Sequence, residues 1–436
     1  MENQFKLVKL RDDKMPNRRG GSVEVFRPLA LEGTKPDTIN SCFYIKGENL
    51  RKYVEEMIMH IHKRTKLGRY EICHQLTSQL GSEKSTMLKY FRERKHFPVY
   101  LLNILISRLS KRKQEIYRSL IQRGVEFFKF GTSATWIKFP KRLNRELSWL
   151  SGAVAADGWV TKEPTGKERL GVVDQNLSAL EVARQSFETA FGYTPSIKRH
   201  KTEDCYLLIV DSKAVVRFFT TFLGFGYGKK AETIHEPPII KSSHYRLDFA
   251  KGVMSFDGSV ELDGTVSIGV KSKKLIDDLY EIFNENGFEL ERRKCSHAFS
   301  LRSPYLSGRK DTEKWVSIFG SNTTKGNRLS FLITGKGELV SSEEEALRAL
   351  EEFVRKKPIS KASISEVFQF AKKKNYFTKY ELMKEFKIAH ATFWKYVLIL
   401  RKAKILISEN KTGRGISNHY IFNPKSEEWT LPPMVF

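Results

Sequence analysis

Two short segments of the sequence end in an aspartate followed by a glycine. Residues 150–158 read LSGAVAADG and residues 250–258 read AKGVMSFDG, so that Asp157 and Asp257 lie 100 residues apart (257 − 157). Each segment is apolar enough for a packed helix and is followed by a strand-like run. Such a repeat predicts two similar subdomains related by a pseudo-twofold axis. Two carboxylates brought to one place are suited to holding a divalent metal ion and hydrolysing a polymer with two strands.

The composition indicates a polyanionic partner. The chain has 436 residues, and 76 Lys and Arg against 50 Asp and Glu give a formal net charge of +26. Nucleic acid is the natural partner of such an excess. The length predicts about two to four domains. No run approaches the ~20 apolar residues of a membrane span, and no amphipathic helix or lipid signal points to a membrane partner.

The cysteines indicate neither a zinc finger nor a disulfide scaffold. Cys42, Cys73, Cys205 and Cys295 are isolated, with no CxxC pair, which is typical of ordinary buried cysteines in a cytoplasmic protein. The N-terminus has no apolar signal-peptide core, so we expect a cytoplasmic, nucleoid-associated protein. The group His60, His62, Cys73 and His74 fits no zinc template, and a structural role is expected for it.

The N-terminal region reads as helical, and residues 1–45 receive no assigned fold. Within residues 46–135, a helix near 69–76 is followed by Gly81, a Ser82 N-cap and a second helix over 83–94. This order is typical of a helix-turn-helix, in which Lys84 and Lys89 would contact DNA. A plain helical bundle with a basic face is the alternative.

The C-terminal region, residues 358–425, resembles a winged helix. Three helices, near 364–371, 379–386 and 391–403, precede two strand-like runs joined by a basic, glycine-rich tip. The third helix would enter the major groove with Lys395, and Arg414 in the wing would contact the DNA backbone or minor groove. A winged helix that binds protein is the alternative.

The central repeat predicts an α+β fold in which each half has the order α-β-β-α-β-β-α. In the first half the predicted helices and strands cover, in order, residues 143–156, 159–162, 169–174, 178–191, 196–201, 206–210 and 212–223. In the second half they run from a helix ending at 256 through 259–262, 265–270, 272–286, 288–293 and 299–302 to a helix near 314–319. The halves therefore occupy about 140–240 and 241–340.

Residues 143 to about 335 resemble the LAGLIDADG homing endonuclease family in its single-chain, two-motif form. The resemblance implies motif helices packed at the interface of the halves, with two four-stranded antiparallel sheets forming a saddle over DNA. It implies a monomer that makes site-specific double-strand cuts with Mg²⁺ or Mn²⁺, leaving short 3′ overhangs across the minor groove. The flanking regions would lengthen the DNA footprint.

Small residues should let the two motif helices approach closely. Gly152 and Ala156 lie one turn apart on one helix face, and Gly252 offers the same in the second motif. Phe256 departs from this pattern and opposes symmetric packing. Ala155 and Ser255 stand where the family name has its first acid, which is the less essential one in the family.

The candidate metal ligands are Asp157 and Asp257, with Gly158 and Gly258 beside them. Both aspartates end a predicted helix, where the helix dipole disfavours a carboxylate. A bound Mg²⁺ ion would offset that cost and the repulsion between two carboxylates. The alternative is that each Asp-Gly pair is simply a turn from helix to strand.

The resemblance also implies catalytic side chains other than the aspartates. It implies a basic residue late in each half, for which we select Lys230, with Lys229 as the alternate, and Lys325. They would polarise water or neutralise charge in the transition state, whereas a solvated lysine is the alternative. A polar residue at the end of each second strand is also implied. Candidates are Gln175 or Asn176 in the first half and Lys271 in the second.

Side chains at alternate strand positions would read bases in the major groove. The candidates are Arg169, Lys198, His200, Arg292, Lys294 and Arg302. Phosphate contacts need only the positive field of the protein and make affinity depend on salt.

Two further functions remain open. A non-catalytic DNA-binding regulator built on a degenerate nuclease core is favoured by the two DNA-binding-like flanks and by Phe256, while retention of both aspartates opposes it. An RNA-splicing maturase has no separate sign in the sequence. The chain begins with Met and lacks intein splice-junction residues, so we expect a free-standing protein.

Overall fold

The computed structural model falls into two compact units, residues 1–175 with 180–252, and residues 176–179 with 253–436. The described residues are 26–31, 42–80, 96–131, 133, 135–294, 298–304, 312–320, 323–335, 337–340, 342–354, 362–409 and 419–431. The division between the units falls inside helix α10 (Arg246–Phe256), which carries the second Asp-Gly motif at its end. Within the described ranges, no helix is both long and apolar enough to cross a bilayer.

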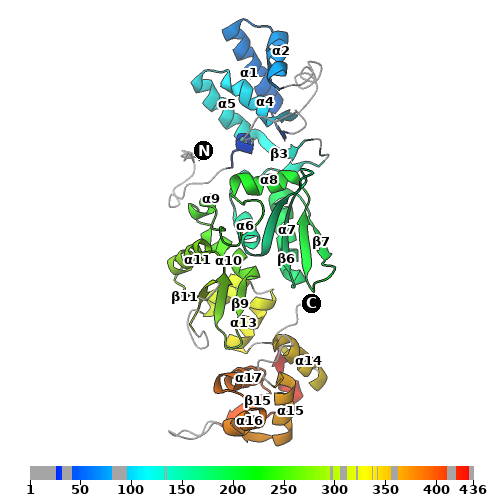
Figure 1. Ribbon diagram of the computed structural model, residues 1–436, viewed down its shortest axis with the longest axis vertical. Coiled ribbons are helices and arrows are strands. Elements are labelled where there is room, and N and C mark those ends of the chain that lie inside the picture. Colours follow the sequence, from blue (N-terminus) through cyan, green and yellow to red (C-terminus); the bar gives the residue numbers. More distant parts are fainter. Residues whose placement is uncertain are drawn as a thin grey trace. The chain divides into compact units, whose positions relative to one another are not determined.

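The N-terminal part of the first unit combines helices with a sheet. A short 3-10 helix, η1 (Pro28–Leu31), precedes the helices α1 (Leu50–Thr65), α2 (Arg69–Leu80), α4 (Val99–Ser107) and α5 (Lys111–Gly124), drawn in blue to cyan in Figure 1. The strands are β1 (Phe43–Gly47), β2 (His96–Pro98), β3 (Val125–Phe130) and β4 (Ile137–Lys138), in the order β2-β1-β3-β4. The helices agree with the helical interpretation of this region, whereas the sheet was not predicted, because β2 and β3 directly adjoin α4 and α5 in the chain.

The predicted second helix of the helix-turn-helix lies outside the described residues, and so do Lys84 and Lys89. The helix that would precede it is α2.

A phenylalanine cluster joins the N-terminal part to the first half of the repeat within the same unit. The Phe218 ring centroid lies 4.8 Å from that of Phe26 and 6.3 Å from that of Phe128. Phe139 and Phe191 pack edge-on against the same ring. Because such rings bury a large apolar area, this cluster fixes helix α8 (Lys213–Phe222) against the N-terminal sheet.

The first half of the repeat has the predicted order of elements. After α6 (Arg145–Asp157) come β5 (Gly158–Lys162), β6 (Glu168–Asp174), α7 (Leu177–Phe191), β7 (Ser196–Arg199), β8 (Tyr206–Val210) and α8. The strands form an antiparallel sheet in the order β5-β6-β8-β7. One face of it carries the buried residues Val160, Leu170, Val172, Leu208 and Val210. A short helix, α9 (Pro238–Lys241), leads toward the second motif.

The second half repeats the same order. α10 is followed by β9 (Gly258–Val260), β10 (Val266–Val270), α11 (Lys273–Glu285), β11 (Glu291–Lys294), β12 (Phe299–Arg302) and α12 (Thr312–Phe319). Its antiparallel sheet has the order β11-β12-β10-β9. The α+β prediction and the α-β-β-α-β-β-α order are therefore confirmed in both halves.

The C-terminal part of the second unit begins with α13 (Thr324–Thr334), β13 (Glu338–Leu339) and α14 (Glu343–Val354). Next come α15 (Ile364–Lys374), β14 (Tyr376–Thr378), α16 (Lys379–Phe386), α17 (His390–Lys402), β15 (Leu406–Glu409), β16 (His419–Phe422), η3 (Ser426–Glu428) and β17 (Thr430–Leu431). The strands β14, β16 and β15 form one sheet, which adds a strand to the predicted pair.

Local sequence signals explain the C-terminal helices. Ser363 with Glu366, and Thr378 with Glu381, form capping boxes at the starts of α15 and α16. The backbone N–H and hydroxyl donors of the cap residues lower the pKa of both glutamates. Lys395 lies half-exposed on α17, while the segment that contains Arg414 lies outside the described residues.

Candidate active site

Each Asp-Gly pair lies where a motif helix turns directly into a strand. α6 ends at Asp157 and β5 begins at Gly158, while the Asp257 amide still donates to the Val253 carbonyl, 3.0 Å away, before β9 begins at Gly258. A Cβ atom on Gly158 would lie 2.5 Å from the Val154 carbonyl oxygen. One on Gly258 would lie 2.4 Å from the equivalent oxygen of Met254. Glycine is therefore required in both motifs because the chain folds back against its own last helical turn.

The two aspartates differ in exposure. Asp157 is exposed, whereas Asp257 is half-exposed. Both follow the apolar, buried part of their helices, so their carboxylates lie at the boundary between core and surface.

Lys230 contacts the C-terminal end of the first motif helix. Its ammonium donates to the carbonyl oxygens of Val154, Ala155 at 2.6 Å and Ala156 at 2.9 Å. The last carbonyls of a helix lack partners within the helix and carry the negative end of its dipole. A cation is therefore stabilised in this position, one residue before Asp157.

Lys325 contacts the second motif helix in the same way. Its ammonium donates to the Ser255 carbonyl at 2.8 Å and to the Phe256 carbonyl at 2.5 Å. The structure thus places each lysine selected from the sequence on the last carbonyls of its own motif helix. Lys229, the alternate, lines a small cavity of about 140 Å³ formed by the loop that it shares with Lys230.

A buried carboxylate anchors the loop that carries Lys230. Glu168 is only 1% exposed, and it accepts from Arg217 at 2.5 Å and from the Tyr227 hydroxyl at 3.0 Å. Burial raises the pKa of Tyr227. Burial also lowers the pKa of Lys213, although its ammonium lies 3.8 Å from Glu168. These contacts hold the loop three residues before Lys230.

Lys325 is positioned by the start of helix α13, whereas Lys230 is positioned by a loop. The Thr323 side chain caps α13 by accepting from the Gly326 amide at 3.0 Å. A Cβ atom on Gly326 would lie 1.9 Å from the Gly320 carbonyl oxygen, so the segment after α12 approaches α13 at backbone contact. Because the N-terminal end of a helix disfavours a cation, the α10 carbonyls offset the cost of placing Lys325 there.

The motif helices approach closely at Gly252. A Cβ atom there would lie 1.9 Å from the Trp149 carbonyl oxygen and 3.0 Å from the Ala153 amide nitrogen. The Ser148 hydroxyl donates to the Tyr245 carbonyl at 2.8 Å, which ties the starts of the helices together. Phe256 is only 6% exposed, so its ring is accommodated within the core.

The ends of the two second strands occupy equivalent positions. Gly158 pairs with Val172 and Gly258 with Ile268, and the candidates Gln175 and Lys271 lie three residues beyond those partners. Both side chains are exposed. Asn176, the alternative to Gln175, donates from its side-chain amide to the Thr324 hydroxyl at 2.9 Å, next to Lys325.

Three base-reading candidates lie on the sheet faces opposite the buried residues. Strand alternation places Arg169 and Lys198 on this open face in the first half and Arg302 in the second. Arg169 pairs with Asp211 at 2.9 Å and with Glu163 at 3.1 Å, while Arg302 pairs with Asp263 at 3.4 Å. His200 lies just after β7.

Arg292 and Lys294 lie on the opposite, helix-covered side, and their predicted placement on the open face was wrong. Arg292 pairs in register with buried Leu301, stacks 3.9 Å from the Tyr280 ring centroid and forms an ion pair with Asp277 at 3.3 Å. Lys294 has the same parity on β11. Arg293, between them, faces the open side of the sheet. The pairing of Arg292 with Leu301 sets these directions, and the composition of the strand alone does not reveal them.

The histidines of the N-terminal region have ordinary structural partners. His60 shares a hydrogen bond with the Lys113 ammonium at 2.8 Å, and His62 with the Leu67 carbonyl at 2.7 Å. Within the part of the chain that the structure describes, neither belongs to a group of metal-ligating side chains.

Comparison with known proteins places the first half in a recognised domain class. Residues 144–222 match the family model described as a LAGLIDADG-like domain. No curated protein matches the sequence. The chain therefore carries a LAGLIDADG-like domain in the first half of its repeat.

Several solved structures are similar to part of the chain. The homing endonuclease I-DmoI in complex with DNA and Mn is 17% identical, with a TM-score of 0.31 over 41% of this chain and 97% of that one. I-WcaI bound to its DNA recognition sequence is 13% identical, with a TM-score of 0.30, covering 40% and 80%. The N-terminal LAGLIDADG domain of WhiA is 12% identical, with a TM-score of 0.29, covering 41% and 84%.

Proposed function

We propose that this protein is a site-specific DNA endonuclease that depends on a divalent metal ion and cuts both strands. The observation that carries the proposal is the matched pair of helix ends. In each half a lysine ammonium contacts the last carbonyls of the motif helix, directly before an Asp-Gly pair. The LAGLIDADG-like domain over 144–222 supports it, and I-DmoI, to which the chain is similar, was crystallised with DNA and Mn.

The donor set of each motif fits Mg²⁺ or Mn²⁺. Asp157 and Asp257 offer carboxylate oxygens, and the peptide groups at Gly158 and Gly258 offer carbonyl oxygens, which are the ligands these hard cations prefer. The exposure of Asp157 leaves its carboxylate accessible to an ion and to a phosphate. When bound, the metal would supply activation of a water molecule and stabilisation of the leaving oxygen.

The lysines would supply fixed positive charge beside each scissile phosphate. The carbonyl contacts of Lys230 and Lys325 hold their ammonium groups in place before DNA binds, so little reorganisation is needed as charge develops in the transition state. Gln175 and Lys271, at equivalent strand ends, would orient the attacking water or the phosphate.

DNA binding would use the open faces of the two sheets. Arg169, Lys198 and Arg302 lie on those faces, together with Arg293, and each arginine would exchange its carboxylate partner for DNA. The net charge of +26 would make affinity fall steeply as salt rises.

The flanking regions would extend the footprint on DNA. In this proposal the C-terminal part acts as a winged helix through Lys395 and Arg414, and the N-terminal part contributes Lys84 and Lys89. The protein would act as a monomer because both halves lie in one chain.

One observation favours a second function, a DNA-binding regulator without nuclease activity. Phe256 occupies the end of the second motif helix and is buried, where the first motif has the small residue Ala156. A second site weakened in this way would leave a protein that binds DNA without cutting both strands.

A library experiment separates the two functions. A randomised duplex library is incubated with the full-length protein and Mg²⁺, and bound and cleaved molecules are sequenced separately. We expect both pools to converge on one sequence, and Asp157→Asn to abolish cutting while leaving binding. Convergence of the bound pool alone, with Mg²⁺ and with Mn²⁺, would establish the regulator.

A further inference from the structure

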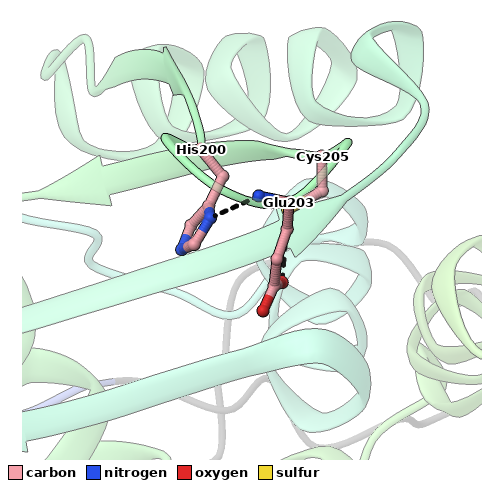
Figure 2. Close-up of side chains that lie close together, drawn as sticks. All are labelled: His200, Glu203 and Cys205. Atoms are coloured by element: carbon pink, nitrogen blue, oxygen red, sulfur yellow. Dashed lines mark hydrogen bonds between the residues drawn. The ribbon is translucent and has the colours of Figure 1, made fainter.

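The turn between β7 and β8 gathers three side chains of different ligand types. His200, Glu203 and Cys205 each offer one ligand atom, and these atoms all lie within 4.8 Å of one another (Figure 2). The cluster lies at one end of the first sheet, beyond Arg199, and contains none of the candidate catalytic residues. No CxxC pair marks it in the sequence, because its three ligands are of three different types within six residues.

Backbone hydrogen bonds hold this turn in shape. The His200 amide donates to the Cys205 carbonyl at 2.8 Å, which closes the hairpin, and the Cys205 amide donates to the Glu203 carbonyl at 2.9 Å. The Glu203 amide donates to His200 Nδ1 at 3.1 Å, and the Cys205 thiol donates to the Glu203 carboxylate at 3.8 Å. A ligand would therefore meet side chains whose backbone is already ordered, which lowers the entropic cost of binding.

The spacing is close to that of a tetrahedral zinc site. Zinc bonds of about 2.0–2.3 Å place neighbouring ligand atoms roughly 3.3–3.8 Å apart. Ligand atoms within 4.8 Å reach that spacing when the side chains move by about 1 Å, which is well within the rotamer freedom of a side chain. Glu203 is exposed and free of core packing, whereas Cys205 is buried and fixed, so the carboxylate is the ligand that would adjust.

The ligand types favour zinc over magnesium. Thiolate and imidazole ligands suit Zn²⁺, whereas Mg²⁺ takes oxygen ligands. The local charge permits a cation, because Glu203 and Asp204 offset Arg199 and Lys201 in this turn, and Arg199 pairs with Asp204 at 3.3 Å.

We propose that His200, Glu203 and Cys205 bind one Zn²⁺ ion, with water in the fourth position. The ion would fasten the end of edge strand β7 to β8, next to Lys198 on the open face of the sheet. It would also take His200 out of base reading. The site is separate from the Asp157 and Asp257 motifs and needs no nuclease activity.

Cobalt spectroscopy on the full-length, metal-free protein tests this site. We expect Co²⁺ to bind with a 1:1 stoichiometry and a thiolate-to-cobalt charge-transfer band that Zn²⁺ abolishes and excess Mg²⁺ leaves unchanged. Cys205→Ser should lose the band, while Cys42→Ser, at a buried cysteine just before β1, should keep it. Absence of the band in the native protein, or its loss in Cys295→Ser with retention in Cys205→Ser, would overturn the proposal.

A second variant keeps the test decisive if Cys205→Ser does not fold. Glu203 is exposed, so Glu203→Gln leaves the core intact, and circular dichroism checks this. We expect Zn²⁺ binding by calorimetry to weaken by more than about tenfold. Glu181→Gln, on an exposed face of α7, should bind as the native protein does. Unchanged Zn²⁺ affinity in Glu203→Gln would contradict the assignment.

Discussion

The two halves of the repeat reach the same local geometry by different routes. In the first half, Lys230 lies on a glycine-rich loop anchored by buried Glu168 through Tyr227. In the second half, Lys325 lies in the first turn of a helix whose start is fixed by the Thr323 cap and the close approach at Gly326. Both lysines nevertheless contact the last carbonyls of a motif helix.

The two halves differ in the element that supports the lysine, which is a loop in the first half and the start of a helix in the second. An ammonium group on the helix end and an Asp-Gly turn occur in both halves, and these are the features that the proposed site needs.

The largest expected effect follows loss of either motif carboxylate. Asp157→Asn or Asp257→Asn should lower the cleavage rate by about 10³-fold or more, since each change would remove a proposed metal ligand. DNA affinity, measured by anisotropy in parallel, should change less than about threefold because phosphate contacts supply most of it. Equal cleavage by the native protein and Asp257→Asn would show that the second half is not a catalytic site.

Loss of a lysine should come next. Lys230→Met and Lys325→Met should each slow cleavage by about 10²- to 10³-fold by removing a preorganised charge. Lys229→Met is the matched control, because Lys229 neighbours Lys230 in the same loop. If Lys230 is the lysine that acts, Lys229→Met should cleave at close to the native rate. Single-turnover rates on a labelled duplex measure all three, and equal losses in Lys229→Met and Lys230→Met would remove the basis for assigning Lys230.

Stability should fall when a motif glycine gains a side chain. Gly158→Ala and Gly258→Ala should each lower the free energy of unfolding by about 1–3 kcal/mol, since a Cβ atom would clash with the preceding helical turn. Gly226→Ala is the control because no atom lies within 4 Å of its added Cβ. Urea denaturation compares them, and a loss in Gly226→Ala as large as in Gly158→Ala would contradict the clash.

The smallest expected effect separates the halves most cleanly. Tyr227→Phe removes one hydrogen bond to buried Glu168 and should lower the free energy of unfolding by about 1 kcal/mol. It should also slow cleavage of only one strand, because this anchor belongs to the Lys230 loop. Equal slowing of both strands, on duplexes labelled strand by strand, would argue against separate roles for the halves.

The periodicity of the sequence was sufficient to predict the order of helices and strands in the repeat. It was not sufficient to predict which side of the sheet every strand side chain faces. The bounds of Tyr206–Val210 and Phe299–Arg302 were predicted to the residue, because an apolar run in the first and an alternating run in the second end at polar turn residues. The side of the sheet that Arg292 faces depends on its pairing with Leu301, which is a tertiary property. The N-terminal sheet was not predicted, because β2 and β3 directly adjoin helices in the chain and their pairings with β1 are long-range.

The lysine positions illustrate the same limit at the candidate site. Lys230 and Lys325 were selected because they are basic and lie late in each half, at similar separations along the sequence from the two aspartates. Their contacts with the helix carbonyls depend on how each chain segment folds back onto its motif helix, which the sequence alone does not reveal. The cluster of His200, Glu203 and Cys205 depends on the hairpin between β7 and β8, whose register brings the three side chains together.

Strand-resolved cleavage of the duplex selected from the library tests the central claim most directly. The duplex is labelled on each strand in turn and incubated with full-length protein, with Mg²⁺ or with a chelator. The account predicts one cut in each strand with Mg²⁺, none with the chelator, and none in Asp157→Asn despite retained binding. Tight binding of the native protein without a cut in either strand, with Mg²⁺ or Mn²⁺, would contradict it.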